Sequence, residues 1–197
     1  MDADAGESMD NSYTFVGGMH GAWRVIEMRE VRGDGLATVE RVDVVHGRML
    51  GQVALREGAH WQLRGLTSNL RYANRNEVDD LVARQPVLDR TEASRAALIP
   101  IKKSAHWWAL AQDERRAIFE GTSHHTQIGL DYLPAIARRL HHCRDIGEPF
   151  DFLTWFEYAP EHAAAFERLV DALRATQEWD YIEREIDIRL ARGDSKA

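Results

Sequence analysis

The segment 182–190 constrains the fold more than any other part of the sequence, because every second side chain in it is charged and those between are mostly aliphatic. Side chains of a β-strand point to opposite faces in turn, so this period of two predicts a strand with one mostly apolar and one charged face. A sheet is therefore expected near the end of the chain. The first face carries Ile182, Arg184, Ile186, Ile188 and Leu190, and the second carries Glu183, Glu185, Asp187 and Arg189.

The elements before this strand follow an order typical of one supersecondary unit. Apolar runs of strand length, a helix-capping aspartate and a proline suited to a first helical turn define them. The segment 136–143 fits both a helix and a strand, and the DIGEP turn after it favours a strand. The resulting order, β-α-β-β-α-β, is ferredoxin-like. The elements are a strand at 96–103, a helix from Asp113 to about Gly129, strands at 136–143 and 150–158, and a helix opened by Pro160.

The first half of the chain is less regular. Residues 1–11 are polar and acidic, so a disordered tail is expected there. Residues 12–95, with a short strand at 53–55 and a short helix after Asn76, are expected to form a shortened N-terminal ferredoxin-like half. Residues 96–191 would form the C-terminal half. Two such sheets facing each other would make an α+β barrel, with helices outside and a histidine-rich cavity between the sheets.

Charge and cysteine content exclude several kinds of protein. The chain has 25 Lys and Arg against 32 Asp and Glu, a net charge of −7, which argues against nucleic acid or a membrane surface as partner. The single cysteine, Cys143, cannot form an internal disulfide, so any metal must be held by histidines and carboxylates. No apolar leader and no run of 18 apolar residues is present, so a cytoplasmic location is expected.

Histidines occur in two adjacent pairs, His124-His125 and His141-His142. Neighbouring residues point about 100° apart on a helix and to opposite faces on a strand. At most one member of each pair can therefore face a given cavity. His125 lies seven residues after Ile118 and would share its helical face, although a lone histidine is more often a surface or core residue than a ligand.

Three other features combine charge with apolar neighbours. Arg138 would share a strand face with Ile136 and point inward, where a guanidinium must pair with a carboxylate or bind an anion. Lys103, with Trp107 four residues later, would suit a planar cofactor that carries carboxylates, or would pack in the core. Glu178 either supports a ligating histidine or ends a helix without further role.

Three stretches carry the most information about function: KKSAHWW, RRLHHCRDIGEPFDFLTWFE and LRATQEWDY, with His125, Gly129 and Tyr132 between the first two. In this order and spacing they resemble the chlorite dismutase family, and the similarity covers about residues 65–189. The resemblance implies a dimeric α+β barrel of ferredoxin-like units that binds one non-covalent haem b per subunit. The chain length is similar to that of the short, dimeric subgroup, which implies a homodimer.

The resemblance also implies roles for individual residues. His125 occupies the position of the ligand to the haem iron, and Glu178 that of the carboxylate bonded to this histidine. Arg138 occupies the position of the distal arginine of chlorite-decomposing members, where the related coproheme decarboxylases generally carry glutamine. Three further residues would lie near the haem propionates or edge: Lys103, Trp107 and Tyr72.

The implied reaction converts chlorite to chloride and dioxygen. Chlorite would pass one oxygen atom to the iron, and Arg138 would hold the transient hypochlorite near the ferryl haem until the O–O bond forms. The alternatives are a coproheme decarboxylase, a dye-decolourising peroxidase and a non-catalytic haem carrier. Arg138 disfavours the first, and the want of an evident distal Asp–Arg motif disfavours the second.

Overall fold

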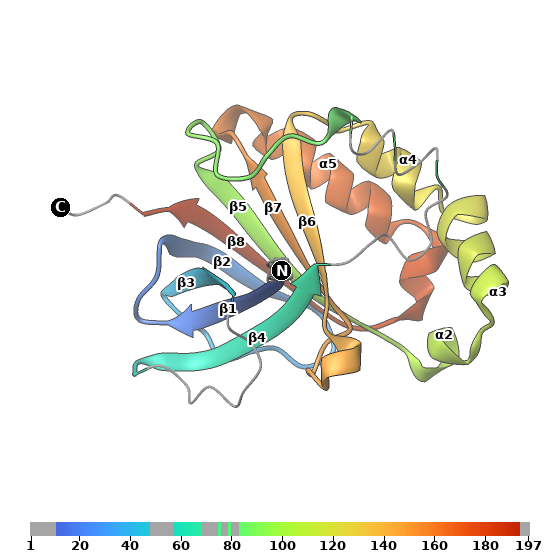
Figure 1. Cartoon of the computed structure of the whole chain (residues 1–197), viewed down its shortest axis with the longest axis horizontal. Helices are drawn as coiled ribbons and strands as arrows, with labels where there is room; N and C mark the ends of the chain where they lie inside the picture. The colour runs from blue at the N-terminus through green and yellow to red at the C-terminus, as the bar shows by residue number, and fades with distance from the viewer. Residues whose placement is uncertain (1–10, 48–56, 68–74, 76–78, 80–82, 194–197) are drawn as a thin grey trace, which may run out of the picture.

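The described part of the chain, residues 11–47, 57–67, 75, 79 and 83–193, contains eight strands that close into an antiparallel barrel (Figure 1). We describe this barrel from a computed structural model. The strand order around it is β1-β3-β2-β8-β5-β7-β6-β4. The strands are β1 (Ser12–Gly18), β2 (Trp23–Arg32), β3 (Arg41–His46), β4 (Ala59–Thr67), β5 (Arg95–Lys103), β6 (Ile136–His142), β7 (Phe152–Tyr158) and β8 (Ile182–Arg192).

Both halves of the barrel have the same strand order. In the C-terminal half the sequence β8-β5-β7-β6 places the last, first, third and second strands side by side, and β4-β1-β3-β2 repeats this order in the N-terminal half. The expected α+β barrel of ferredoxin-like units is therefore confirmed. Residues 19–22 alone join β1 to β2, whereas several helices join β5 to β6.

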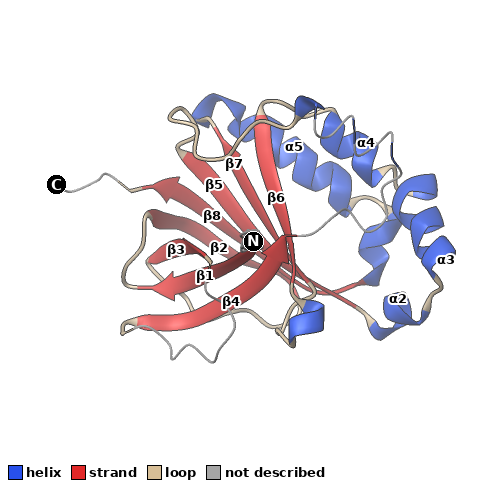
Figure 2. Cartoon of the chain, in the orientation of Figure 1, coloured by secondary structure: helices blue, strands red, loops and turns tan. Residues whose placement is uncertain are grey.

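The α-helices lie on one side of the molecule, outside the C-terminal half of the barrel (Figure 2). α5 packs its apolar stripe, which includes Phe166 and Val170, against Ile136 and Phe156 on the outer face of the sheet. The helical elements are α2 (Ala105–Ala109), α3 (Gln112–Arg116), the π-helical η1 (Ala117–Thr122), α4 (His125–Leu130), η2 (Arg144–Ile146), η3 (Pro160–His162), α5 (Ala163–Arg174) and η4 (Gln177–Tyr181).

The single helix expected from Asp113 to Gly129 is wrong, because the chain turns within it. After α3 the helix widens to the π form of η1, and His124 then adopts a left-handed conformation with φ of 50°. A left-handed residue cannot continue a right-handed hydrogen-bond ladder, so α4 begins anew at the next residue. His125 is therefore the first residue of its own helix, and the helical register with Ile118 that the sequence suggested does not exist.

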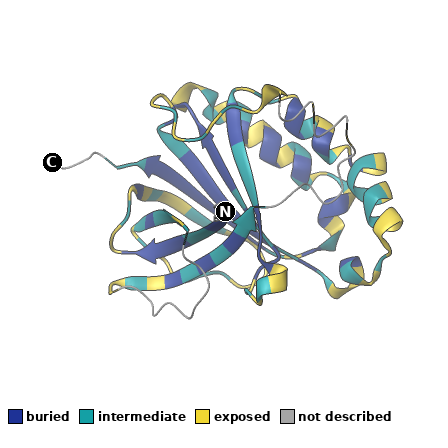
Figure 3. Cartoon of the chain, in the orientation of Figure 1, coloured by how far each residue is buried: buried dark blue, intermediate teal, exposed yellow. Residues whose placement is uncertain are grey.

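The barrel interior is packed, so the cavity expected between the two sheets is wrong. Phe15, Leu98, Leu153 and Ile188 are fully buried and belong to one core contributed by strands of both halves. Buried residues run along much of the barrel strands (Figure 3). Protein cores are filled at nearly crystalline density, which leaves a barrel of eight strands with little internal space. A ligand site in this fold must therefore lie elsewhere, between the sheet and the helices that cover it.

Some expectations fall outside the described residues. They concern the tail at 1–10, the strand at 53–55, most of the helix after Asn76, and Tyr72. Among the described residues, no helix is both long and apolar enough to cross a bilayer.

Candidate active site

Three ionisable side chains from distant parts of the chain meet on the helix-covered side of the barrel. Lys103 is the last residue of β5, His125 is the first of α4, and Glu178 lies in η4. One carboxylate oxygen of Glu178 lies 2.7 Å from Nδ1 of His125, and the other accepts a hydrogen bond of 2.6 Å from the Lys103 ammonium. Both oxygens of this buried carboxylate are therefore satisfied, as buried charges require.

The electrostatics of the site keep Glu178 ionised. Burial would raise the pKa of this carboxyl group, but the charges and hydrogen bonds of His125 and Lys103 outweigh burial and lower the pKa to about 2. Burial lowers the pKa of the Lys103 ammonium, and the carboxylate opposes that shift. A carboxylate only accepts hydrogen bonds, so Nδ1 of His125 is the donor in this contact, and Nε2 is the ring nitrogen left for a ligand.

Two residues that the sequence did not single out hold this group in place. The Ser123 hydroxyl accepts a hydrogen bond of 3.0 Å from the backbone N–H of Glu178, and the Asp151 carboxylate accepts one of 2.7 Å from the backbone N–H of Lys103. Both are buried. The contact between Ser123 and Glu178 spans 55 residues of sequence, so no local sequence pattern predicts it.

Aromatic rings enclose the polar group. The Lys103 ammonium lies 4.4 Å from the centroid of the Trp107 ring, and the His125 imidazole stacks on Phe119 with centroids 4.4 Å apart. Trp107 is buried, whereas the side chain of His125 is 20% exposed. The imidazole is thus fixed on its Nδ1 side and accessible to a ligand from outside.

Arg138 lies on the outer face of the sheet, not in the barrel interior. It shares this face with Ile136, which packs in the layer beneath the helices. A Cβ atom added to Gly129 would lie 2.8 Å from Nη1 of Arg138, so the missing side chain of this glycine leaves the space that the guanidinium occupies. The expectation that Arg138 points inward is therefore wrong, because both faces of this sheet are covered.

The charge of Arg138 is not neutralised by a neighbour in the described part of the chain. None of the ion pairs among these residues includes its guanidinium, and burial lowers its pKa with no acidic group opposing the shift. The carboxylate partner that the sequence allowed is thus not found there. Gly129 follows His125 by one helical turn, so α4 directs both residues toward the same side.

The other histidines do not join this site. His124 is exposed, whereas His141 and His142 are buried in β6. His141 lies in the barrel interior against Tyr13 and Phe15. Among the described residues, no group of three or more His, Cys, Asp or Glu side chains is placed to hold a metal ion.

Comparison with known proteins identifies the family of this chain. Residues 45–193 match the family model described as chlorite dismutase. The chain belongs to the chlorite dismutase family. A curated chlorite dismutase from Ideonella dechloratans is 31% identical over 123 residues, which are 60% of this chain and 40% of that protein. The chain thus covers less than half the length of this curated relative.

Solved structures of chlorite dismutases share the barrel. A dimeric chlorite dismutase from Nitrobacter winogradskyi is 56% identical, with a TM-score of 0.83 over 91% of this chain and 99% of that chain. A variant chlorite dismutase from Candidatus Nitrospira defluvii is 23% identical, with a TM-score of 0.67 over 93% and 92% of the two chains. At this lower identity the second match shows the fold alone.

Proposed function

We propose that this chain is a haem-dependent chlorite dismutase, which converts chlorite to chloride and dioxygen. The observation that carries the proposal is the position of Arg138. Its guanidinium has no acidic partner in the described part of the chain and fills the space left by Gly129, which lies one helical turn after His125. The family membership and the identity of 56% to a chlorite dismutase support it.

The residues of the site fit a haem group. His125 would hold the iron, and its Nδ1–H donates to Glu178, which orients the ring and would raise its basicity as a ligand. The aromatic ring of Phe119 would border a flat cofactor, and the Lys103 and Trp107 pair would lie toward its edge. Haem iron, when bound, would supply the redox chemistry that the conversion of chlorite requires.

Arg138 performs the part of the reaction that depends on charge. Chlorite carries one negative charge, and so does the chlorine oxyanion left after it gives up an oxygen atom. A guanidinium is always protonated at neutral pH, so it is a poor general base and a good anion anchor. In a site shielded from water its attraction for the oxyanion is stronger than in bulk solvent. Arg138 therefore retains the oxyanion until both oxygen atoms leave as dioxygen.

The proposal includes assembly. Because the Nitrobacter winogradskyi relative is dimeric and its whole chain is covered, we propose a homodimer with one non-covalent haem b in the C-terminal half of each subunit.

An oxygen electrode tests the proposed function. The haem-loaded protein should release one dioxygen per chlorite consumed, together with one chloride. A protein with a Soret band that releases no oxygen would be a haem carrier, and a protein that oxidises dyes with peroxide but releases no oxygen from chlorite would be a peroxidase. Either result would contradict the proposal.

A further inference from the structure

The indole of Trp179 links the candidate iron ligand to a buried carboxylate on β8. Its Nε1 donates a hydrogen bond of 2.8 Å to Glu185, and its ring lies nearly parallel to the His125 imidazole, at 18° with centroids 6.4 Å apart. Offset, parallel rings at this separation are in favourable contact. Trp179 is itself buried and directly follows Glu178, so the two residues reach His125 from the same short helix, η4.

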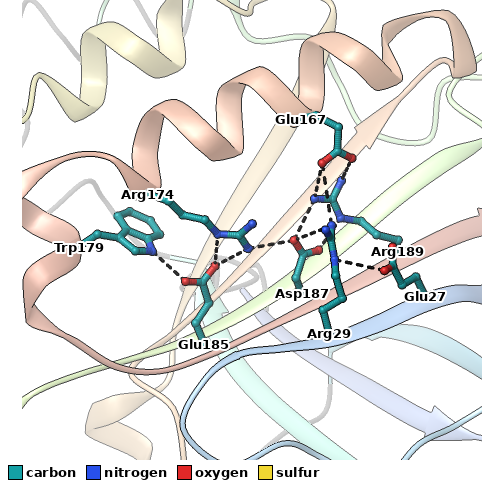
Figure 4. A network of polar contacts seen from close by, with 8 residues as sticks. All are labelled: Glu27, Arg29, Glu167, Arg174, Trp179, Glu185, Asp187 and Arg189. Atoms are coloured by element: carbon teal, nitrogen blue, oxygen red, sulfur yellow. Dashed lines mark hydrogen bonds and ion pairs between the residues drawn. The ribbon is translucent and has the colours of Figure 1, made fainter.

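Glu185 is held by a chain of alternating charges along β8 (Figure 4). One of its oxygens accepts hydrogen bonds from both Nε and Nη2 of Arg174, at 2.8 and 2.6 Å. Nη2 also donates a hydrogen bond of 2.9 Å to Asp187. Asp187 in turn accepts from Arg189, whose Nη1 donates to Glu167 at 2.6 Å. Glu185 and Asp187 are fully buried. The Glu185 carboxylate, which accepts the Trp179 hydrogen bond, is therefore held in place by residues of α5 and of β8.

The backbone around Trp179 is fixed separately. Arg32 of β2 donates from Nη1 to the carbonyl oxygens of Trp179 and Ile182, at 3.1 and 2.8 Å. With the backbone held, the orientation of the indole depends on its side-chain torsions, and the bond to Glu185 selects one of them. The plane of the ring next to His125 is thus set by Glu185.

We propose that Glu185 is a positioning residue for His125, which acts through the Trp179 indole. The inference rests on the proposed role of His125 as haem ligand. Glu178 fixes the Nδ1 atom of the imidazole, Phe119 stacks on its ring, and the pair of Trp179 and Glu185 gives the plane of that ring a further support.

Haem release to an excess of apomyoglobin measures this support. Trp179→Phe keeps an aromatic ring and removes the N–H donor, and Glu185→Gln keeps the volume and removes the charge. Residues that orient a metal ligand typically contribute a factor of 10–100 in metal affinity, so each change should release haem about tenfold faster than the parent. Because both act through one contact, the double variant should release haem no faster than the single variants. The reduction potential should shift in the same direction in all three.

A matched pair in the barrel interior is the control. The Trp155 indole donates to the buried Glu157 carboxylate at the same 2.8 Å but does not stack on His125. Trp155→Phe and Glu157→Gln should lower the thermal midpoint and leave haem release and the reduction potential at the parent values. If they accelerate release as much as the Trp179 and Glu185 changes, the inference is overturned. Additive effects in the double variant, or parent-like release in Trp179→Phe, overturn it as well.

His125→Ala in the same assay separates this inference from the proposed function. If His125→Ala holds haem as firmly as the parent, the ligand assignment itself fails. If it loses haem while Trp179→Phe and Glu185→Gln do not change its release, only the positioning role fails. Should Glu185→Gln not fold, Trp179→Phe carries the test, since its change removes one hydrogen bond and no charge.

Discussion

The two faces of the C-terminal sheet are both covered, yet they are built differently. The inner face contributes fully buried Leu98, Leu153 and Ile188 to the barrel core. The outer face and the helices over it combine an apolar layer with buried charges, such as Glu185 on β8 and Glu178 in η4. Burial of a charge costs several kcal/mol and is tolerated only with close partners, so each of these carboxylates is paired. Hydrophobic burial therefore builds the barrel, while the polar site depends on the helix-covered face.

This contrast explains what the buried ion pairs contribute. A buried ion pair seldom stabilises a fold more than apolar side chains of the same volume would. Its partners are nevertheless held in one geometry, because each charge must stay against its counter-charge. The outer face thus provides fixed orientation around His125, whereas the inner face provides stability.

The largest effect should come from His125. His125→Ala removes the only imidazole that Glu178 orients among the described residues, so the purified protein should retain almost no haem and show no Soret band. His124→Asn is the control, since asparagine tolerates the left-handed backbone at that position. A normal Soret band in His125→Ala, or loss of the band in His124→Asn, would contradict the assignment.

The inner face should show the next largest effect, in stability at acid pH. Burial, followed by the charges of Arg139 and His142, lowers the pKa of His141 to about 4 despite its hydrogen bond to the Leu153 carbonyl oxygen. Below pH 6.5 the unfolded chain takes up a proton at His141 that the folded protein does not. The parent should therefore lose roughly 3 kcal/mol of unfolding free energy as pH falls from 6.5 to 4.

Urea unfolding of the parent and of His141→Phe at several pH values measures this loss. The difference in unfolding free energy between the two proteins should be constant above pH 6.5. Below pH 6.5 the parent should lose stability relative to the variant. Since His141 belongs to the inner face, haem release should not change with it. A pH-independent difference would show that His141 is not held neutral in the folded protein.

A smaller effect is expected at Glu178. Glu178→Gln keeps the shape of the side chain but weakens the bond to Nδ1 of His125, so haem affinity should fall about tenfold. A less electron-donating imidazole favours ferric iron less, so the reduction potential should rise. Spectroelectrochemical titration measures this reduction potential. A value equal to that of the parent would contradict the proposed support of His125 by Glu178.

Much of the fold follows from the sequence. Period two in 182–190 and the turn at 145–149 predicted β8, β6 and β7, because strand and turn signals are local. The break at His124 was missed, since only the π-helical turn of η1 and its tertiary contacts require it. Alternation in β6 also showed that Ile136 and Arg138 share a face. It could not tell which face, because both are buried and neither is marked by polarity.

The site was less predictable from residues alone. The bond between His125 and Glu178 joins positions 53 residues apart, and only the family resemblance connected them. Ser123 and Trp179 were not predicted at all, since each contributes through a contact with no sequence periodicity. Long-range polar contacts of this kind depend on the packing of the whole barrel and its helices.

The most direct test of the central claim is the number of turnovers that Arg138→Ala completes before inactivation, with chlorite as substrate and oxygen as readout. Loss of a charge-assisted contact costs about 1.5–3 kcal/mol, which is roughly a tenfold to hundredfold weaker hold on the anion. Escaping hypochlorite should inactivate this variant early, and a hypochlorite scavenger should prolong its activity. Arg139→Ala, whose guanidinium lies over the Tyr13 ring on the inner side, should behave like the parent. Parent-like oxygen yield and turnover number in Arg138→Ala would contradict the claim.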